Sequence, residues 1–334
     1  MTISAMKTKI NVTQLSLDEA ERQRLWEETR RHPLYYFRNR FQWFNYPKWR
    51  YVAPFPLHVD FEASSNCNLT CPMCFRRYME NTGDFTDMSY DLYKKGIDEC
   101  AENELYSIRL SWRGESTIHP QLIEMIEYAR ESGIKEISFL TNGSGLNEEF
   151  SMKLIKAGLD CITISIDGLM ENYNKLRSPL DFNETVANIK GLYDLREKHG
   201  HTFPRIKVQG IFEYFKGDEA EYYETFRPIT DNISFNVKHD YQLRYQKQEG
   251  NLFCPYLWQR LTITASGLIP LCISDWDTEI ELGNLADTTF KEVWLGEKME
   301  ETRKIQLEDR RLELRPCQKC IRTKDADVTA FVKS

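Results

Sequence analysis

The sequence predicts an α/β fold: a partial (βα)6 barrel with a small C-terminal module made of a β-hairpin and a helix. From residue 57 onward, short apolar runs alternate with amphipathic stretches of helical period, which is typical of successive βα units and a parallel sheet. A chain of 334 residues with 41% hydrophobic content can bury the core of one barrel and still carry an appendage. We predict three regions, residues 1–56, 57–245 and 246–334, and expect the incomplete barrel to admit a substrate on its open side.

The N-terminal region is predicted to hold a helix and an aromatic stretch. A capping-box pattern from Ser16 to Glu19 indicates a charged helix that ends near Arg31. Between Tyr35 and Tyr51, nine aromatic residues are interleaved with four basic ones. Such a stretch can bind nucleic acid, a membrane surface or an anionic substrate. We favour a segment that packs its rings against the barrel while the basic tips remain in water.

The barrel region is predicted to contain six strands joined by helices. Glycines at 133 and 158 are expected to stop two of the helices. The expected strands are residues 57–63, 106–112, 136–141, 161–166, 206–212 and 233–237, and the expected helices are residues 89–102, 121–132, 147–157, 183–198 and 218–227.

The C-terminal module begins near Phe253. A hairpin is expected from residues 261–264 through Ser266-Gly267 into residues 268–271. A helix near residues 289–304 follows it. This pattern differs from the βα alternation and predicts a separate small unit.

Three cysteines, Cys67, Cys71 and Cys74, lie within eight residues after the first predicted strand. An iron–sulfur cube takes one thiolate per iron, so three cysteines leave one iron open to an external ligand. The alternative is a zinc knuckle, but a closed zinc site would need a distant fourth ligand. The spacing therefore favours a cluster with one open coordination position.

At these residues the sequence resembles the radical S-adenosylmethionine (SAM) enzymes, whose signature is C-x3-C-x2-C after the first barrel strand. The resemblance implies that the open iron of a [4Fe–4S] cluster chelates the amino and carboxylate groups of SAM. It implies cleavage of SAM to a 5′-deoxyadenosyl radical that abstracts a hydrogen atom, with electrons from a flavodoxin- or ferredoxin-type reductant. Met73 replaces the aromatic residue usual before the third cysteine, and Phe75 can take over part of its packing against adenine.

Polar residues follow each predicted strand, where the loops of parallel βα units converge. Gly114-Glu115 resembles the family segment whose backbone pairs with the SAM amino group, although Arg113 and Ser116 depart from the usual Gly and Pro. Trp112 and Arg113 are candidates to recognise an anionic or sugar-like substrate.

The next strand ends supply further candidate SAM contacts. By the resemblance, Asn142 lies near the ribose hydroxyls, and Ser165 and Arg177 contact the methionine carboxylate, where a guanidinium can form a bidentate pair. Each has a structural alternative: Asn142 can form an Asx turn, and Arg177 can be a solvated cation at a helix end.

A second set of cysteines lies in the C-terminal module: Cys254, Cys272, Cys317 and Cys320. Their spacing resembles the twitch module, a shortened relative of the SPASM module, which holds one auxiliary [4Fe–4S] cluster. A four-cysteine zinc site uses the same residue types and stays open as an alternative. The two remaining cysteines, Cys100 and Cys161, are expected to be small core residues.

The carbon radical left by hydrogen abstraction can be oxidised, epimerised or used to form a bond. Epimerisation commonly needs a thiol at the mouth of the barrel, where neither remaining cysteine is expected, so oxidation is favoured. The auxiliary cluster then accepts the electron and a base takes the proton. The candidate bases are Asp275, Asp277, Glu213 and His239, although a capping or surface role is open for each.

Composition limits the partners and the compartment. A net charge of −7 argues against a nucleic acid as the main partner. The N-terminus has no apolar signal region and no 18-residue apolar run occurs, so we expect a cytoplasmic protein that does not span a membrane.

The expected substrate is small and polar: a carbohydrate, an aminocyclitol or a nucleotide derivative. One rival is a peptide maturase that uses the aromatic stretch to dock its substrate. Another is a non-enzymatic metal-binding or nucleic-acid-binding protein.

Overall fold

A computed structural model describes residues 31–80, 85–236, 238, 253–318 and 320 of this chain. Its centre is a seven-stranded parallel sheet in the order β6-β5-β4-β3-β2-β1-β7. The order follows the sequence from β1 to β6, as expected for consecutive right-handed βα units. The strands are β1 (His58–Phe61), β2 (Ser107–Arg109), β3 (Glu136–Thr141), β4 (Cys161–Ser165), β5 (Arg205–Ile211), β6 (Asn232–Asn236) and β7 (Arg260–Ile263).

All six predicted strands and all five predicted helices of the barrel are confirmed, with small shifts at their ends. Gly158 ends α5 with a left-handed φ of 83°, as the sequence indicates. One helix, α6, was not predicted. The helices are α3 (Tyr90–Glu102), α4 (Leu122–Glu131), α5 (Glu148–Ala157), α6 (Met170–Leu176), α7 (Phe182–Lys198) and α8 (Glu219–Phe226), with 3-10 turns η1 (Phe75–Tyr78), η2 (Ser116–Ile118), η3 (Phe212–Tyr214) and η4 (Arg227–Ile229).

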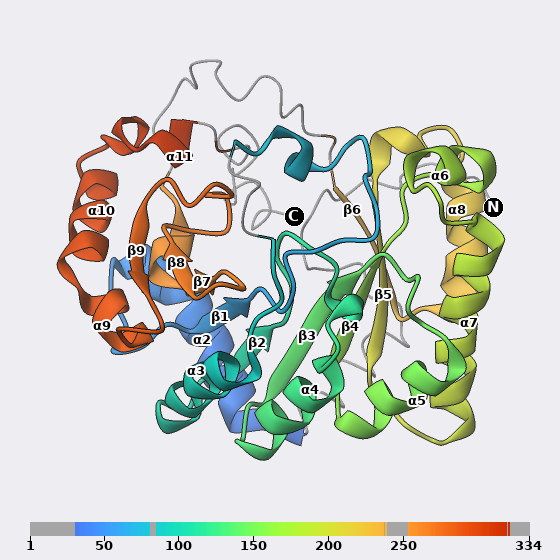
Figure 1. Cartoon of the computed structure of the whole chain (residues 1–334), viewed down its shortest axis with the longest axis horizontal. Coiled ribbons are helices and arrows are strands. Elements are labelled where there is room, and N and C mark those ends of the chain that lie inside the picture. Colours follow the sequence, from blue (N-terminus) through green and yellow to red (C-terminus); the bar gives the residue numbers. More distant parts are fainter. Residues whose placement is uncertain (1–30, 81–84, 237, 239–252, 319, 321–334) are drawn as a thin grey trace.

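The helices that connect the strands lie along one face of the sheet, and the hydrophobic core fills the space between them (Figure 1). Side chains along each strand point alternately to the two faces of the sheet, and this explains the arrangement. Val59 and Phe61 of β1 are fully buried in that core, and the Phe61 ring packs against Tyr93 of α3. The apolar side chains thus face the helices, and the intervening residues of each strand point to the other face, which we call the inner face.

The inner face is polar. It carries Asp60, Thr163 and Lys207 in the middle of their strands, and the burial of β3 and β5 alternates accordingly between buried and half-buried residues. Continuous apolar runs are usual where both faces of a parallel sheet are dry. This sheet therefore presents one face to a polar interior.

The predicted hairpin is wrong. Its first segment, β7, pairs in parallel with β1 and becomes the seventh strand of the barrel sheet. The turn is present, because Gly267 donates to the carbonyl of Thr264, with φ of +95° at the glycine. The second segment, β8 (Leu268–Pro270), instead pairs antiparallel with β9 (Glu281–Asn284). Apolar runs in the sequence predict that strands form, but they do not predict which neighbouring strand each one pairs with.

The predicted C-terminal helix is divided in two. A capping box of Thr289 and Glu292 begins α9 (Phe290–Leu295), and α10 (Glu297–Leu307) follows. Gly296 lies between them with an extended ψ of 162°, which breaks the helical hydrogen bonding. The remaining described elements of the module are η6 (Pro255–Trp258), η7 (Arg311–Glu313) and α11 (Arg315–Gln318).

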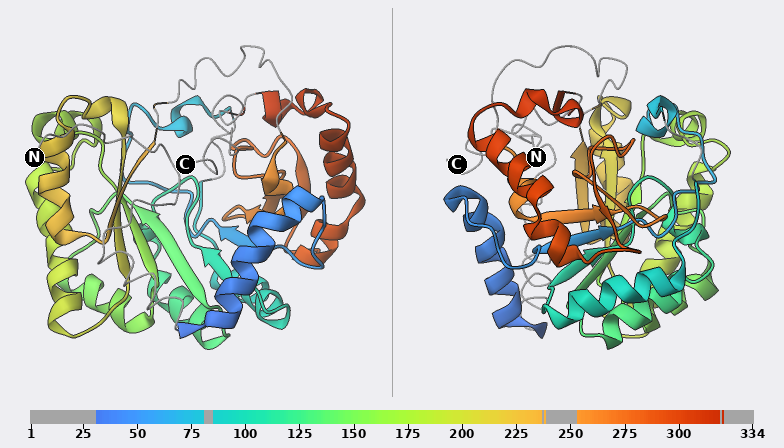
Figure 2. Two further views of the ribbon diagram at one scale, coloured as in Figure 1. Left: turned by 180° about the vertical axis from the view of Figure 1, so that it is seen from behind. Right: turned by 60° about the vertical axis from the view of Figure 1, so that its left-hand side comes forward.

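The aromatic stretch forms helix α2 (Pro33–Trp49), which comes to the front in the rear view of Figure 2. Part of the expected packing is confirmed: Trp43 meets the ring of His58, and Arg40 pairs with Glu136. The expectation that the rings are buried is otherwise wrong, because Phe37 and Phe41 remain 62% and 53% exposed. The helix predicted before residue 31 lies outside the described residues. Among the described helices, none is long and apolar enough to cross a membrane.

Gly96 on α3 marks the tightest contact between the barrel and the C-terminal module. A Cβ at this position would lie 2.8 Å from Phe61 and 3.2 Å from Phe290 of α9. We predict that Gly96→Ala destabilises the protein by about 1–3 kcal/mol through overpacking. Gly191→Ala on α7 is the matched control, because nothing lies within 4 Å of its Cβ position, and it is expected to stabilise by about 0.5–1 kcal/mol. Melting temperatures of the two variants test this, and equal stability would contradict the close packing.

Candidate functional site

The loop with Cys67, Cys71 and Cys74 follows β1 at the carboxyl edge of the sheet. Cys71 is buried and the other two thiols are half-buried. Two contacts shape the loop: Cys74 N–H donates to the carbonyl of Cys71 at 3.1 Å, and Arg76 donates to the carbonyl of Ser65 at 2.8 Å. Burial raises the pKa of all three thiols, so a metal that binds here must displace their protons.

Gly114 lets the segment after β2 approach the start of the cysteine loop. A Cβ on Gly114 would lie 2.2 Å from the carbonyl oxygen of Ser64 and 2.3 Å from that of Asn66. Glu115 N–H donates to the Asn66 carbonyl at 2.8 Å. Only glycine permits this backbone contact.

The buried Glu115 carboxylate joins the ends of β2 and β3. Its Oε1 accepts from the hydroxyls of Thr117 and Thr141, each at 2.7 Å. Its Oε2 accepts from the backbone N–H of Asn142 at 2.7 Å. The Glu115 side chain is therefore a structural link between the two loops, and a SAM contact at this segment must use its backbone.

Asn142 makes two kinds of contact. Its Oδ1 accepts from Ser144 N–H at 2.9 Å, which is the Asx turn anticipated as the alternative. Its Nδ2 donates to Asn68 of the cysteine loop at 2.8 Å. Asn142 thus joins the cysteine loop to β3, and its role toward ribose remains a prediction, as does that of the half-buried Ser165 at the end of β4.

Arg177 lies close enough to the cysteine loop that its positive charge opposes the burial-driven rise in the pKa of Cys71. Its Nε and Nη2 donate to Asp167 at the end of β4. The side chain is only 15% exposed, so the solvated-cation alternative is wrong. No hydrogen bond from Nη1 is found among the described residues, and contact with the methionine carboxylate remains a prediction.

Arg113 does not offer a free guanidinium to a substrate, so this expectation is corrected. Its Nε and Nη2 donate to the two oxygens of Glu62 at 2.7 and 2.6 Å, and Nη1 donates to the Trp276 carbonyl at 3.1 Å. The indole N–H of Trp112 donates to the Ile273 carbonyl at 2.9 Å. Both residues join the barrel to the C-terminal module instead.

The two cysteine-bearing loops also meet through aromatic rings. Phe75, next to Cys74, stacks on Trp276 of the module with ring centroids 4.6 Å apart and planes at 24°. One face of Phe75 is therefore already covered. Any packing of adenine would use its other face or the half-buried Met73.

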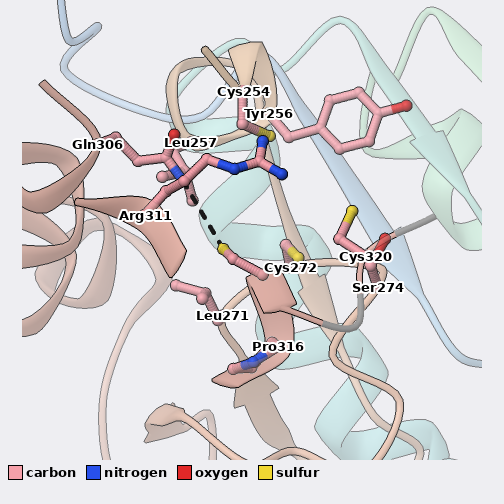
Figure 3. A pocket seen from close by; sticks show the side chains of 11 residues that line it. Cys254, Tyr256, Leu257, Leu271, Cys272, Ser274, Gln306, Arg311, Pro316 and Cys320 are labelled. Atoms are coloured by element: carbon pink, nitrogen blue, oxygen red, sulfur yellow. Dashed lines mark hydrogen bonds between the residues drawn. The ribbon is translucent and has the colours of Figure 1, made fainter. Parts of the chain in front are cut away.

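Cys254, Cys272, Cys317 and Cys320 line one pocket, which confirms that the fold brings the second cysteine set together (Figure 3). Gln306 donates to the sulfur of Cys317 at 3.7 Å, and the buried Arg311 lies beside the thiols. Burial raises the pKa of Cys317 to about 12, and the Arg311 guanidinium opposes this shift.

Both sets of thiols supply the ligand type that iron–sulfur clusters take. No three His, Cys, Asp or Glu side chains in the described part of the chain converge closely enough to chelate one metal ion. Four thiols around a shared pocket instead leave room for a polynuclear cluster with every iron ligated. Cys67, Cys71 and Cys74 would supply three ligands to a second cluster.

The candidate bases differ in how they are held. Asp275 is buried and accepts from the backbone N–H groups of Leu271, Glu279 and Ile280, so it shapes the loop after Cys272; burial raises its pKa to about 6. Asp277 accepts from Glu80 N–H at 2.9 Å. Glu213 is exposed and accepts from Lys238 N–H at 2.7 Å. His239 lies outside the described residues.

The two remaining cysteines differ in burial. Cys100 is fully buried in the core, as expected. The expectation is wrong for Cys161, which is half-buried on the inner face of β4 beside Ser138 of β3.

Sequence reasoning missed several residues that shape the site. Glu62 ends β1 and could have been found by the strand-end rule that identified its neighbours. Asn68, Gln306 and Arg311 carry no pattern of their own, because polar residues in loops and helices are usually solvated. Asn68 follows Cys67 directly in the sequence, whereas only the fold brings Gln306 and Arg311 beside the second cysteine set.

Comparison with known proteins identifies the two cysteine regions. Residues 61–203 match the radical SAM superfamily, and residues 254–321 match SPASM, an iron–sulfur cluster-binding domain. The crystal structure of BtrN in complex with AdoMet and 2-DOIA is similar, with a TM-score of 0.55 at 15% identity over 79% of this chain and 92% of BtrN. That similarity shows a shared fold.

Two curated relatives resemble about half of the chain. The tungsten-containing aldehyde ferredoxin oxidoreductase cofactor-modifying protein of Pyrococcus furiosus is 33% identical over 46% of this chain and 43% of its own length. The antilisterial bacteriocin subtilosin biosynthesis protein AlbA of Bacillus subtilis is 31% identical over 48% of this chain and 34% of its own length. The matched part is therefore less than half of each relative.

We predict that the anaerobically loaded chain holds about eight irons, four in each of two cubes. Replacing Cys317 and Cys320 together by alanine should lower this to about four and leave SAM binding intact. Cys100→Ala is the control and should keep the full iron content. Iron and zinc analysis tests the assignment, and one zinc per chain that disappears in the double variant would refute the second cluster.

Gly114→Ala should disrupt the first site, because its Cβ would meet backbone oxygens that cannot move aside like a flexible side chain. We expect at least a hundredfold loss of SAM cleavage with the iron of the second cysteine set retained. Gly191→Ala again serves as the control. Unchanged production of 5′-deoxyadenosine by Gly114→Ala would show that this backbone contact is dispensable.

Proposed function

This chain belongs to the radical SAM superfamily and carries a C-terminal SPASM/twitch-like module, and we propose that it dehydrogenates a small polar substrate. The substrate class is a carbohydrate, an aminocyclitol or a nucleotide derivative. The observation that carries the proposal is the pocket lined by all four cysteines of the module. Four protein thiolates close the coordination of a cluster, which suits it to accept an electron rather than to bind a substrate.

When bound, SAM supplies the radical that removes a hydrogen atom from the substrate carbon, and the auxiliary cluster accepts the electron that this carbon then gives up. The protein must take the proton from the adjacent hydroxyl or amine, which completes the loss of two hydrogens. Of the candidate bases, Asp275 is committed to three N–H donors. Asp277 lies between the module and the segment after the first cysteine loop, and we assign the proton to it.

The contacts between barrel and module support this assignment. Trp112 and Arg113 donate to the carbonyls of Ile273 and Trp276, on either side of Asp275 and next to Asp277. They hold the module loop at the carboxyl edge of the sheet. Asp277 is therefore positioned at the same edge as the loop that carries Cys67, Cys71 and Cys74.

A peptide substrate is the second candidate function. The exposed face of α2, with Leu34, Phe37, Phe41 and Trp49 between 53% and 83% exposed, is available to a docking peptide. Helix α2 has three basic and no acidic residues, which suits an acidic peptide. The relative AlbA acts in bacteriocin biosynthesis, as its name states.

The test is incubation of the reduced, cluster-loaded protein with SAM and panels of sugars, aminocyclitols, nucleotides and peptides. We expect 5′-deoxyadenosine together with a small-molecule product lighter by two mass units. Asp277→Asn should lower product formation by about 10²–10⁴-fold while uncoupled SAM cleavage continues. Asp287→Asn, at an exposed turn, is the control.

Other outcomes would decide between the alternatives. A product of unchanged mass that takes up deuterium from solvent indicates epimerisation and refutes dehydrogenation. Turnover of peptides alone supports the second candidate. If Asp277→Asn retains full activity, the proton goes to another group, and Glu213→Gln is the next variant.

A further inference from the structure

One cation on the inner face of the sheet has no counter-charge among the described residues. Lys207 lies in the middle of β5, in register with Thr163 of β4 and Asn232 of β6. In a parallel sheet, residues in register project to the same face, so these three side chains form a polar row. No hydrogen bond or ion pair to the Lys207 ammonium is found in the described part of the chain.

Two carboxylates on the inner face, by contrast, are paired with arginines. Asp60 pairs with Arg109 and Arg260, and Glu62 pairs with Arg113. Buried charges usually persist only when they are paired or bind a ligand. Lys207 is therefore distinguished from this set by the lack of a partner.

Further polar groups lie on the same face between Lys207 and the carboxyl end of the strands. Gln209 follows it on the same face, in register with Ser165 and Ser234. The hydroxyl of Ser234 and the Oδ1 of Asn236 are buried without a hydrogen-bond partner. Burial without a partner costs free energy, which a polar ligand would recover.

The distance along the strands between Lys207 and the carboxyl end of β4 relates the ammonium group to the expected reaction centre at the mouth of the barrel. Lys207 is in register with Thr163, two residues before Ser165 at the carboxyl end of β4, which corresponds to about 7 Å along the strand. That separation is about the length of one sugar ring. Burial also lowers the pKa of Lys207, and a bound anion would favour its charged form.

We propose that Lys207, with Gln209 and Ser234, binds the anionic group, carboxylate or phosphate, of a small carbohydrate-type substrate whose reacting carbon lies at the mouth of the barrel. This inference rests on the proposed dehydrogenation and specifies its substrate class. A uronate and a sugar phosphate present the same chemistry to the ammonium group. The test must therefore include both.

The experiment is calorimetric titration of the cluster-loaded, SAM-bound, unreduced protein with a set of hexoses and pentoses. Each neutral sugar is matched by its carboxylate and its phosphate form. We expect at least one anionic form to bind at least tenfold more tightly than its neutral parent. Lys207→Met should abolish that difference, Lys207→Arg should retain most of it, and Lys156→Met, on the exposed surface of α5, should behave like the unmodified protein.

Two results overturn the inference: no anionic form binds better than its parent, or the preference survives in Lys207→Met. Turnover of the same sugars separates this inference from the proposed function. If a neutral sugar is oxidised and Lys207→Met leaves its kcat/KM unchanged, dehydrogenation stands and the anion site falls. If anions bind through Lys207 but no bound sugar loses two mass units, the anion site stands and dehydrogenation falls.

Discussion

The buried carboxylate of Glu62 is the contact on which the arrangement of the two cysteine sets depends. It lies at the end of β1, just before the loop with Cys67, and is fully buried. It accepts two side-chain bonds from Arg113 after β2 and one from the N–H of Ala265 after β7. One residue thus joins the strand before the first cysteine set, the neighbouring strand and the chain that leads to the second set. A buried pair of this kind contributes to geometry more than to net stability, because desolvation offsets much of the attraction.

The same junction continues through aromatic and backbone contacts. Arg113 also donates to the Trp276 carbonyl, and the Trp276 ring stacks on Phe75 beside Cys74. These contacts tie the loop after Cys272 to the loop before η1. The barrel and the module are therefore connected at the edge where both cysteine sets lie, and the position of one constrains the other. For the electron transfer that we propose between a substrate and a second cluster, such a fixed relation matters more than the strength of any single contact.

The distribution of polarity across the sheet explains how one structure can be both stable and reactive. The face toward the helices holds the apolar core, which supplies the burial that folding requires. The inner face carries charges and amides, most of them satisfied by one another. Since the helix-facing side of the sheet supplies the stability, the side chains of the inner face can be polar and can bind a ligand. Among the described residues, the polar groups of this face without a hydrogen-bond partner include Ser234 and Asn236 of β6.

The sequence by itself determined strands β1 to β6 and the five helices predicted between them, because each is set by local periodicity. It also identified the two cysteine sets as candidate ligands, because three thiols on one loop need no tertiary knowledge to be recognised. The carboxyl-end rule also located Gly114, Glu115 and Asn142 correctly at one edge. Tertiary structure alone decided which strand β7 joins, that Phe37 and Phe41 of α2 remain exposed, that Arg113 is held by Glu62, and that Lys207 has no partner among the described residues. These outcomes depend on pairing between residues far apart in the chain, and local sequence patterns carry no record of which distant surface a side chain will meet.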